Sequence, residues 1–231
     1  MSIINLPGLK IPKIICTTES KYNGKIEVVQ VGKTLKIIVG GILQSVNWDS
    51  PNARRLVWGR VLDVLEQNTQ TLRNIFIMGL GGGTMQHLIS KEYPNAHIVS
   101  VDIDSVMVDI ARKYFDLDSI PNHRVIVGDA CKVIIEPNSF ELVKKSFHVA
   151  LVDIYIGSKF PDLGNSGNFV AAVKDMVVPG GLVIFNRIYT ENHQDEVNNF
   201  IDFIGDFLHD VKTLVIAGYT NSDNILIYGR T

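Results

Sequence analysis

The chain has 231 residues, of which 46% are hydrophobic and 20% charged, and its formal net charge is −2. This composition excludes a disordered chain, and the charge lacks the basic excess that is typical of nucleic-acid-binding proteins. At roughly 150 residues per domain, the length predicts one large domain with a small appendage. No apolar run approaches the roughly 18 residues of a membrane span.

The cysteines, Cys16 and Cys131, are too few for a disulfide framework, which favours a reducing compartment. The six histidines lack the paired spacing of zinc sites, so we expect no metal. The first ten residues do not show a charged region followed by an apolar one, the pattern of a signal peptide. We therefore expect a cytoplasmic protein with neither a membrane nor a nucleic-acid partner.

Residues 1–49 are predicted to form a small antiparallel β domain. Short β-branched runs are separated by glycines, which suit hairpin turns because these require positive φ. The predicted strands are 13–16, 26–30, 34–39 and 42–46.

The pattern changes at Ser50–Pro51, a helix-start signal, and residues 50–231 form the predicted larger domain. Apolar runs that suit a parallel sheet covered by helices now alternate with helical stretches. Predicted strands cover 75–80, 97–103, 124–129, 148–154, 182–188, 212–218 and 224–229. Predicted helices follow Ser50, cover 85–93, 106–115, a short segment near Val143 and 168–177, and end with 197–208.

A short link between the last two strands makes them antiparallel neighbours, because a parallel pair needs a longer crossover. The order of elements predicts an α/β Rossmann-like fold with a seven-stranded, mostly parallel sheet and a C-terminal antiparallel hairpin. This order is similar to that of class I S-adenosylmethionine-dependent methyltransferases.

A glycine-rich loop follows the first strand of the larger domain, with Gly79, Gly81 and Gly83 leading into a helix near Thr84. Glycines there allow a tight turn and let a ligand approach the backbone. A dinucleotide fingerprint would need a third glycine at position 84. The G-x-G-x-G spacing is instead typical of adenosylmethionine folds, which disfavours a nicotinamide dehydrogenase.

Acidic residues end the next two strands. Asp102, with Ile103 beside it, lies about 20 residues past the loop, where a carboxylate can accept both ribose hydroxyls. Asp104 should instead cap the following helix. Asp129 could accept a hydrogen bond from an adenine amino group, with Cys131 or Ala130 near the ring.

The fourth strand ends in L-V-D-I-Y, which brings Asp153 to the ligand edge of the sheet. A carboxylate there can orient or deprotonate a nucleophile, and Tyr155 could wall the pocket. These two residues are the candidate catalytic residues. Residues 156–167, rich in Gly, Ser, Asn and Pro, are interpreted either as a lid over the substrate or as a simple connection.

Nearly the whole chain resembles the polyamine aminopropyltransferases, or spermidine synthases, and their relatives. The matching motifs are S-K-Y-N-G-K-I-E-V, T-L-K-I-I-V-G-G-I-L-Q-S, G-L-G-G-G-T, V-D-I-D, G-D-A, L-V-D-I-Y and V-P-G-G-L-V-I-F-N. The resemblance implies a small β domain before a methyltransferase-like domain, usually in a homodimer. It also implies that Gln44 lies at the active site and that Asp102 binds ribose.

The chain departs from that family at residues that handle a diamine. The family reads G-G-G-D-G-G in the loop, with an acid that binds the aminopropyl ammonium. In this chain, Thr84 is taken to stand at the position of that acid. The family also reads D-S-S-D after the fourth strand, where only Asp153 remains and Ile156 takes the second acid's place. The family's Tyr-His pair is also missing. Binding a polycation without paired acids is costly.

The sequence therefore predicts methyl transfer from S-adenosylmethionine to a small acceptor. One alternative is an aminopropyltransferase that uses decarboxylated adenosylmethionine, with acids supplied by residues such as Asp49, Asp162 or Glu191. Another is a non-catalytic module that binds a nucleoside such as methylthioadenosine.

Overall fold

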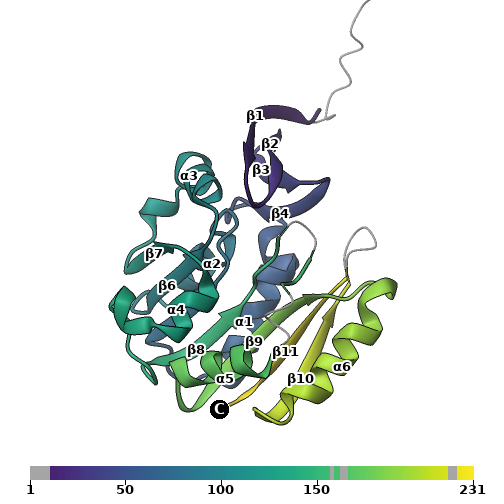
Figure 1. The fold of residues 1–231 in the computed structure, drawn as a ribbon. Coiled ribbons are helices and arrows are strands. Elements are labelled where there is room, and N and C mark those ends of the chain that lie inside the picture. Colours follow the sequence, from purple (N-terminus) through teal and green to yellow (C-terminus); the bar gives the residue numbers. More distant parts are fainter. Residues whose placement is uncertain (1–10, 157–158, 162–165, 218–222) are drawn as a thin grey trace, which may run out of the picture.

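The computed structural model describes residues 11–156, 159–161, 166–217 and 223–231. Its strands form two separate sheets. The smaller sheet is antiparallel and joins neighbouring strands in chain order (Figure 1). Its strands are β1 (Lys13–Ser20), β2 (Gly24–Val31), β3 (Thr34–Val39) and β4 (Ile42–Val46). The predicted N-terminal antiparallel sheet is confirmed, whereas the domain boundary after residue 49 stays a prediction.

The larger sheet has seven strands in the order β10-β11-β9-β8-β5-β6-β7. Strands β5 to β9 pair in parallel, and β11 runs antiparallel to both of its neighbours. The strands are β5 (Asn74–Met78), β6 (His97–Asp102), β7 (His123–Val127), β8 (Phe147–Val152), β9 (Val177–Ile188), β10 (His209–Ile216) and β11 (Asn224–Arg230). The Rossmann-like methyltransferase fold and its C-terminal antiparallel hairpin are confirmed.

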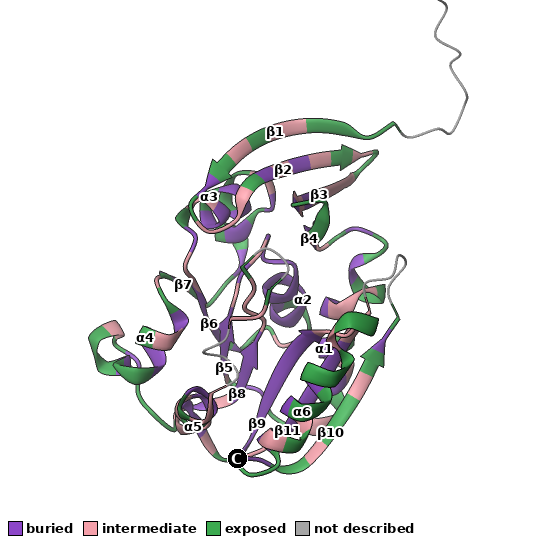
Figure 2. Cartoon of the chain, turned by 45° about the vertical axis from the view of Figure 1, so that its right-hand side comes forward, coloured by how far each residue is buried: buried purple, intermediate pink, exposed green. Residues whose placement is uncertain are grey.

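Helices cover both faces of this sheet and bury it between two apolar clusters. One cluster includes side chains of α1, α2 and α3, and the other includes those of α4, α5 and α6. The central strands are therefore buried, while β10 at the sheet edge is largely exposed (Figure 2). The helices are α1 (Val57–Asn68), α2 (Thr84–Glu92), α3 (Ser105–Tyr114), α4 (Ala130–Ile135), α5 (Gly167–Met176) and α6 (Gln194–Ile204).

Two predicted helix positions were wrong. Ser50 does not start a helix: α1 begins only at Val57, after the extended residue Leu56, although the Ser50 hydroxyl accepts from the N–H of Asn52 at 3.4 Å. Val143 lies outside any helix, since α4 starts at the Asp129 cap and stops just before Pro137. Proline disfavours helical backbone at the residue before it, which explains the early end.

A third apolar cluster joins the smaller sheet to α3. Ile26, Val28 and Ile37 of the sheet pack with Met107 and Phe115 of the larger domain. This packing holds the smaller sheet over the edge at which β5 and β6 end (Figure 1).

Hydrogen bonds of Asp104 stabilise the same contact between the smaller sheet and α3. Its carboxylate accepts from the backbone N–H of Val106, which confirms the predicted helix cap. It also accepts from the Ser20 hydroxyl at 2.5 Å and from the Asn23 amide at 2.6 Å, across the two sheets. The side chain is 2% exposed, so these bonds replace water.

Some predictions fall outside the described residues. They concern residues 1–10, most of the loop at 156–167 and the link at 220–222. No helix in the part of the chain that the structure describes is long and apolar enough to cross a membrane.

Replacing Asp104 tests these hydrogen bonds. Asp104→Ala removes the cap and leaves Ser20 and Asn23 without their partner, so the free energy of unfolding should fall by about 2–4 kcal/mol. Asp109→Ala is the control, because Asp109 is exposed on the same helix, and should change it by less than about 0.5 kcal/mol. Urea denaturation measures both, and equal effects would contradict a specific role for Asp104.

Candidate functional site

A cavity of about 570 Å³ lies between the carboxyl ends of the parallel strands and the smaller sheet. Strand β5 sits between β6 and β8, so the chain order reverses at this point. Open α/β sheets bind ligands at such a switch point, and the cavity has the size of a small-molecule site. Of the predicted residues, nine line it: Gln44, Gly79, Gly81, Asp102, Ile103, Asp129, Ala130, Asp153 and Tyr155.

The glycine loop forms the floor of the cavity beside β8. A Cβ atom at Gly79 would lie 2.0 Å from the carbonyl oxygen of Asp153, and φ there is +98°, so another residue would not fit. Gly81 also lines the cavity and has positive φ. Gly83 does not line it, and packs near Leu117 instead. The loop thus brings backbone, rather than side chains, to a ligand.

Thr84 also lies away from the cavity, so its predicted place among the cofactor-binding residues is wrong. Its buried hydroxyl donates to the carbonyl of Val46 and lies 3.3 Å from the Ser45 hydroxyl. Aligned letter by letter from Gly79, the family motif G-G-G-D-G-G places its acid at Gly82, not at Thr84. A Cβ atom at Gly82 would meet the Ser45 side chain at 3.0 Å, so the loop packs too tightly there for an acid without rearrangement.

Asp102 occupies the end of β6 with both carboxylate oxygens engaged. One accepts from the backbone N–H of Leu80 and the other from that of Asp104, each at 2.9 Å. Burial raises the pKa of Asp102 to about 6, although these hydrogen bonds act in the opposite direction. Each oxygen keeps a lone pair, so accepting ribose hydroxyls stays a prediction that the geometry allows.

Asp129 lies two residues after the end of β7 and lines the cavity together with Ala130 and Cys131. Its carboxylate accepts from the backbone N–H of Cys131 at 2.9 Å and caps α4. It can still accept from a ligand, since one carboxylate has room for several donors. The structure therefore combines the cap with a place at the adenine end of the predicted site.

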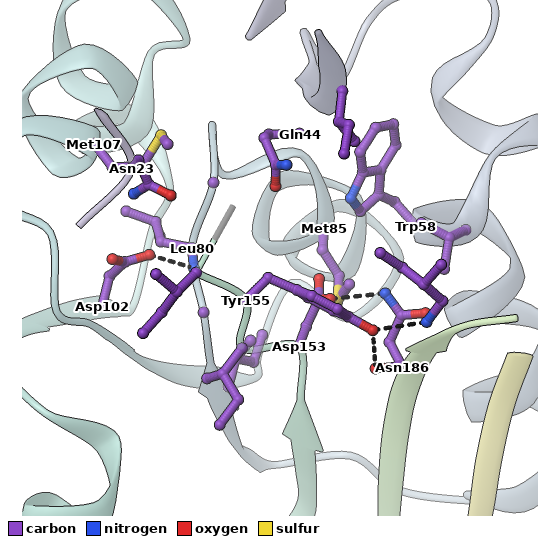
Figure 3. Close-up of a pocket in the computed structure, with 18 of the residues that line it drawn as sticks. Asn23, Gln44, Trp58, Leu80, Met85, Asp102, Met107, Asp153, Tyr155 and Asn186 are labelled. Carbon is purple, nitrogen blue, oxygen red and sulfur yellow. Dashed lines mark hydrogen bonds between the residues drawn. The ribbon is translucent and has the colours of Figure 1, made fainter. Parts of the chain in front are cut away.

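Asp153 emerges after β8, near the middle of the cavity, and is held by a chain of amides (Figure 3). The Asn186 amide donates to its Oδ1 at 2.7 Å, and Asn224 donates to Oδ1 of Asn186 at 3.1 Å. Burial raises the pKa of Asp153 to about 6; the Asn186 hydrogen bond lowers it, and the charge of Asp102 raises it further. The amide chain fixes Oδ1 and leaves Oδ2 for an acceptor.

Tyr155 serves as a wall, as its hydroxyl is already used. It donates to the backbone carbonyl of Asn186 at 3.1 Å and accepts from the N–H of Ile188 at 2.7 Å. Burial raises the pKa of the phenol well above its usual range. Asp153, rather than Tyr155, is thus placed to move a proton.

Several lining residues went unpredicted. Asn186 and Asn224 could have been found, since both lie on strands at the ligand edge of the sheet, and Asn186 stands in the quoted V-I-F-N motif. Trp58 on α1 and Asn23 from the smaller sheet gave no signal, because they reach the cavity only through tertiary packing.

The charges of the cavity are all of one sign. Asp102, Asp129 and Asp153 line it, and within the described ranges no Lys, Arg or His does. Nor does any group of three His, Cys, Asp or Glu among the described residues stand where it could hold a metal ion. The cavity therefore favours a cationic ligand.

The chain is similar to known proteins. Residues 75–155 match the family model described as "Methyltransferase domain". A polyamine aminopropyltransferase from Vibrio vulnificus is 29% identical over 172 residues, which cover 73% of this chain and 56% of the relative. An eEF1A lysine and N-terminal methyltransferase homolog from Drosophila pseudoobscura is 26% identical over 50% of this chain and 18% of the relative.

Solved structures show the same fold. A spermidine synthase from Thermotoga maritima has a TM-score of 0.73 and 14% identity, over 94% of this chain and 72% of that one. The chain thus has the class I S-adenosylmethionine-dependent methyltransferase fold and resembles polyamine aminopropyltransferases and spermidine synthases. It spans little more than half the length of the Vibrio relative, and both curated relatives are named as transferases.

The pH dependence of stability tests the electrostatics of Asp153. A carboxyl whose pKa rises from 3.8 to about 6 on folding destabilises the folded protein above pH 6, by about 3 kcal/mol, and this cost disappears as the pH falls toward 4. Asp153→Asn should therefore stabilise the protein at pH 7.5 and much less at pH 4.5. Urea denaturation at both values measures this, and an equal gain at the two would contradict it.

Proposed function

We propose that this protein is a transferase that binds S-adenosylmethionine, or a related adenosyl thioether, and moves a methyl group to a small acceptor. The adenosyl end of the site would be formed by Asp102 for ribose and Asp129 for adenine. Both relatives support a transferase, and the methyltransferase family model and the eEF1A methyltransferase homolog support methyl transfer. A homodimer and a cytoplasmic location stay predictions.

Asp153 would act on the acceptor. Adenosylmethionine supplies a methyl group on a sulfonium, whose positive charge suits the carboxylates of the cavity. Asp153 takes a proton from the acceptor, the freed lone pair forms the bond to the methyl carbon, and the carbon–sulfur pair stays on sulfur. A pKa of about 6 leaves Asp153 mostly ionised at neutral pH and ready to accept that proton.

The side chain at position 156, Ile156, is the reason to propose methyl transfer rather than aminopropyl transfer. It lines the cavity, 47% exposed, where the resembling family has the second acid for its diamine. Of the alternative acids, Asp49 and Glu191 are exposed and outside the cavity lining, and Asp162 lies outside the described residues.

Aminopropyl transfer is the second candidate, and one observation favours it. The described lining has no basic side chain to pair with the carboxylate of adenosylmethionine, and the decarboxylated form would not need one. Backbone N–H groups of the glycine loop would have to bind that carboxylate in the methyl-transfer reading.

Calorimetric titration separates these candidates. S-adenosylmethionine should bind at least about tenfold more tightly than methylthioadenosine, because only the former brings a positive sulfonium to the carboxylates. It should also bind more tightly than decarboxylated adenosylmethionine, because backbone N–H groups of the glycine loop would bind the carboxylate that the decarboxylated form lacks. A clear preference for the decarboxylated form would contradict methyl transfer and favour the aminopropyl candidate.

Variants of the two central acids separate binding from chemistry. Asp153→Asn should lower kcat by about 10²–10⁴-fold while the Kd for the adenosyl ligand stays within about threefold. Asp102→Asn should weaken that Kd by about tenfold or more, as it loses charged hydrogen bonds to ribose. Asp109→Asn, on the exposed face of α3, is the control. If Asp153→Asn behaves like the parent protein, the non-catalytic nucleoside-binding alternative is favoured.

A further inference from the structure

The two ends of the cavity differ in chemistry, and the strand order separates them. Asp102 and Asp129 follow β6 and β7, on one side of the glycine loop, while Asp153 follows β8. On the other side of Asp153 lie β9, β11 and β10. Strand β9, the nearest of them, is three strands from β6, which is about 14 Å at the usual strand spacing. Figure 3 shows Asp102 at one side of the cavity and Trp58 at the other, with Asp153 between them.

The far end is apolar. Trp58 of α1 is 7% exposed and still lines the cavity, and aliphatic side chains surround it. Its principal lining residues are Leu56, Val57, Trp58, Ile156, Ile188 and Ile216. A ligand group at this end exchanges water for apolar contacts, which favours a hydrocarbon chain or ring.

Asn186, a polar side chain of this end, is already committed. The Asn186 amide donates to Asp153 and accepts from Asn224, so its dipole is fixed. On the β9, β11 and β10 side of Asp153, none of the described lining residues is Asp or Glu. A second ammonium seated here would be buried without a counter-charge, which is strongly unfavourable.

The net charge of the lining selects against anions as well. Its three carboxylates are not balanced by any basic side chain in the described part of the chain, so an acceptor that carries a carboxylate or phosphate would be repelled. One positive group is favoured, at the one carboxylate that borders the apolar end. That carboxylate is Asp153.

We propose that the acceptor site takes a monoamine, with its single ammonium on Asp153 and an apolar chain or ring against Trp58, Ile156 and Ile188. This inference rests on the proposed function, whose acceptor it specifies. The same chemistry is shared by a free alkyl- or arylalkylamine and by the side chain of a lysine. Within the described lining a second ammonium would find no carboxylate, so the site should bind a polyamine more weakly.

Fluorescence of Trp58 reports on this site directly. The chain has two tryptophans, and Trp48 does not line the cavity but stacks on His87 at 5.6 Å. Trp48→Phe therefore leaves Trp58 as the reporter, and Trp58→Phe leaves a control that should not respond.

The probes are n-pentylamine and 1,4-diaminobutane, which are close in size and differ in whether the far end is a methyl or an ammonium group. Each is titrated into the protein in the presence of saturating methylthioadenosine, which cannot donate a methyl group to either amine. The Trp48→Phe variant should bind n-pentylamine at least about tenfold more tightly. Equal affinity, or tighter binding of the diamine, would overturn the proposal.

A matched pair of substitutions tests the cause of the preference. Ile156→Asp adds a carboxylate at the apolar end and should shift the ratio of the two affinities toward the diamine by about tenfold, whereas Ile156→Asn should leave n-pentylamine preferred. If the aspartate does not move the ratio, the missing counter-charge is not what excludes diamines, and the proposal fails.

Two further outcomes show whether the amine is free or part of a lysine side chain, and separate this inference from the proposed function. Nα-acetyl-lysine methylamide is titrated alongside: binding comparable to that of n-pentylamine assigns the site to a lysine side chain, and much weaker binding assigns it to a free amine. If adenosylmethionine binds but neither monoamine does, this inference alone is refuted. If n-pentylamine binds but is never methylated, the proposed function fails and the amine site stands.

Discussion

The structure depends on keeping negative charge inside a cavity whose described lining has no basic side chain to balance it. Asp102 and Asp153 both have a pKa raised to about 6 by burial, and the charge of Asp102 raises that of Asp153 further. Hydrogen bonds supply the compensation instead, from the N–H of Leu80 to one acid and from the Asn186 amide to the other. Such an arrangement is costly when empty and favourable once a cation binds.

The smaller sheet completes the cavity, since it fixes the glycine loop from above. The Ser45 hydroxyl accepts from the backbone N–H of Gly82 at 2.7 Å, and Thr84 reaches the carbonyl of Val46. Asp104 ties β1 and the turn after it to the start of α3. The loop conformation is therefore set by contacts between the sheets as well as by its glycines, and Gln44 enters the cavity from the same strand as Ser45.

Much of this could be predicted because the ligand edge of a parallel sheet is a local property of strand ends. Asp102, Asp129 and Asp153 each end an apolar run, so the sequence places them at one edge. The same rule would have found Asn186, but a neutral amide attracts less notice than an acid. The role of Asp104 as a cap was also readable, from its position just before a helix.

The errors at the site share a cause, which is tertiary context. Thr84 looked like a ligand residue, yet its hydroxyl is taken by Val46, a partner 38 positions away. Trp58 was invisible as a site residue because an apolar side chain on an amphipathic helix is indistinguishable from a core residue.

The identity of the transferred group is the most direct test of the account. The protein is incubated with n-pentylamine and either S-adenosylmethionine or its decarboxylated form, and the amine is analysed by mass spectrometry. The account predicts N-methylpentylamine from adenosylmethionine, formed at least about 10²-fold more slowly with Asp153→Asn. An aminopropyl adduct from the decarboxylated form, with no methylated product, would contradict it.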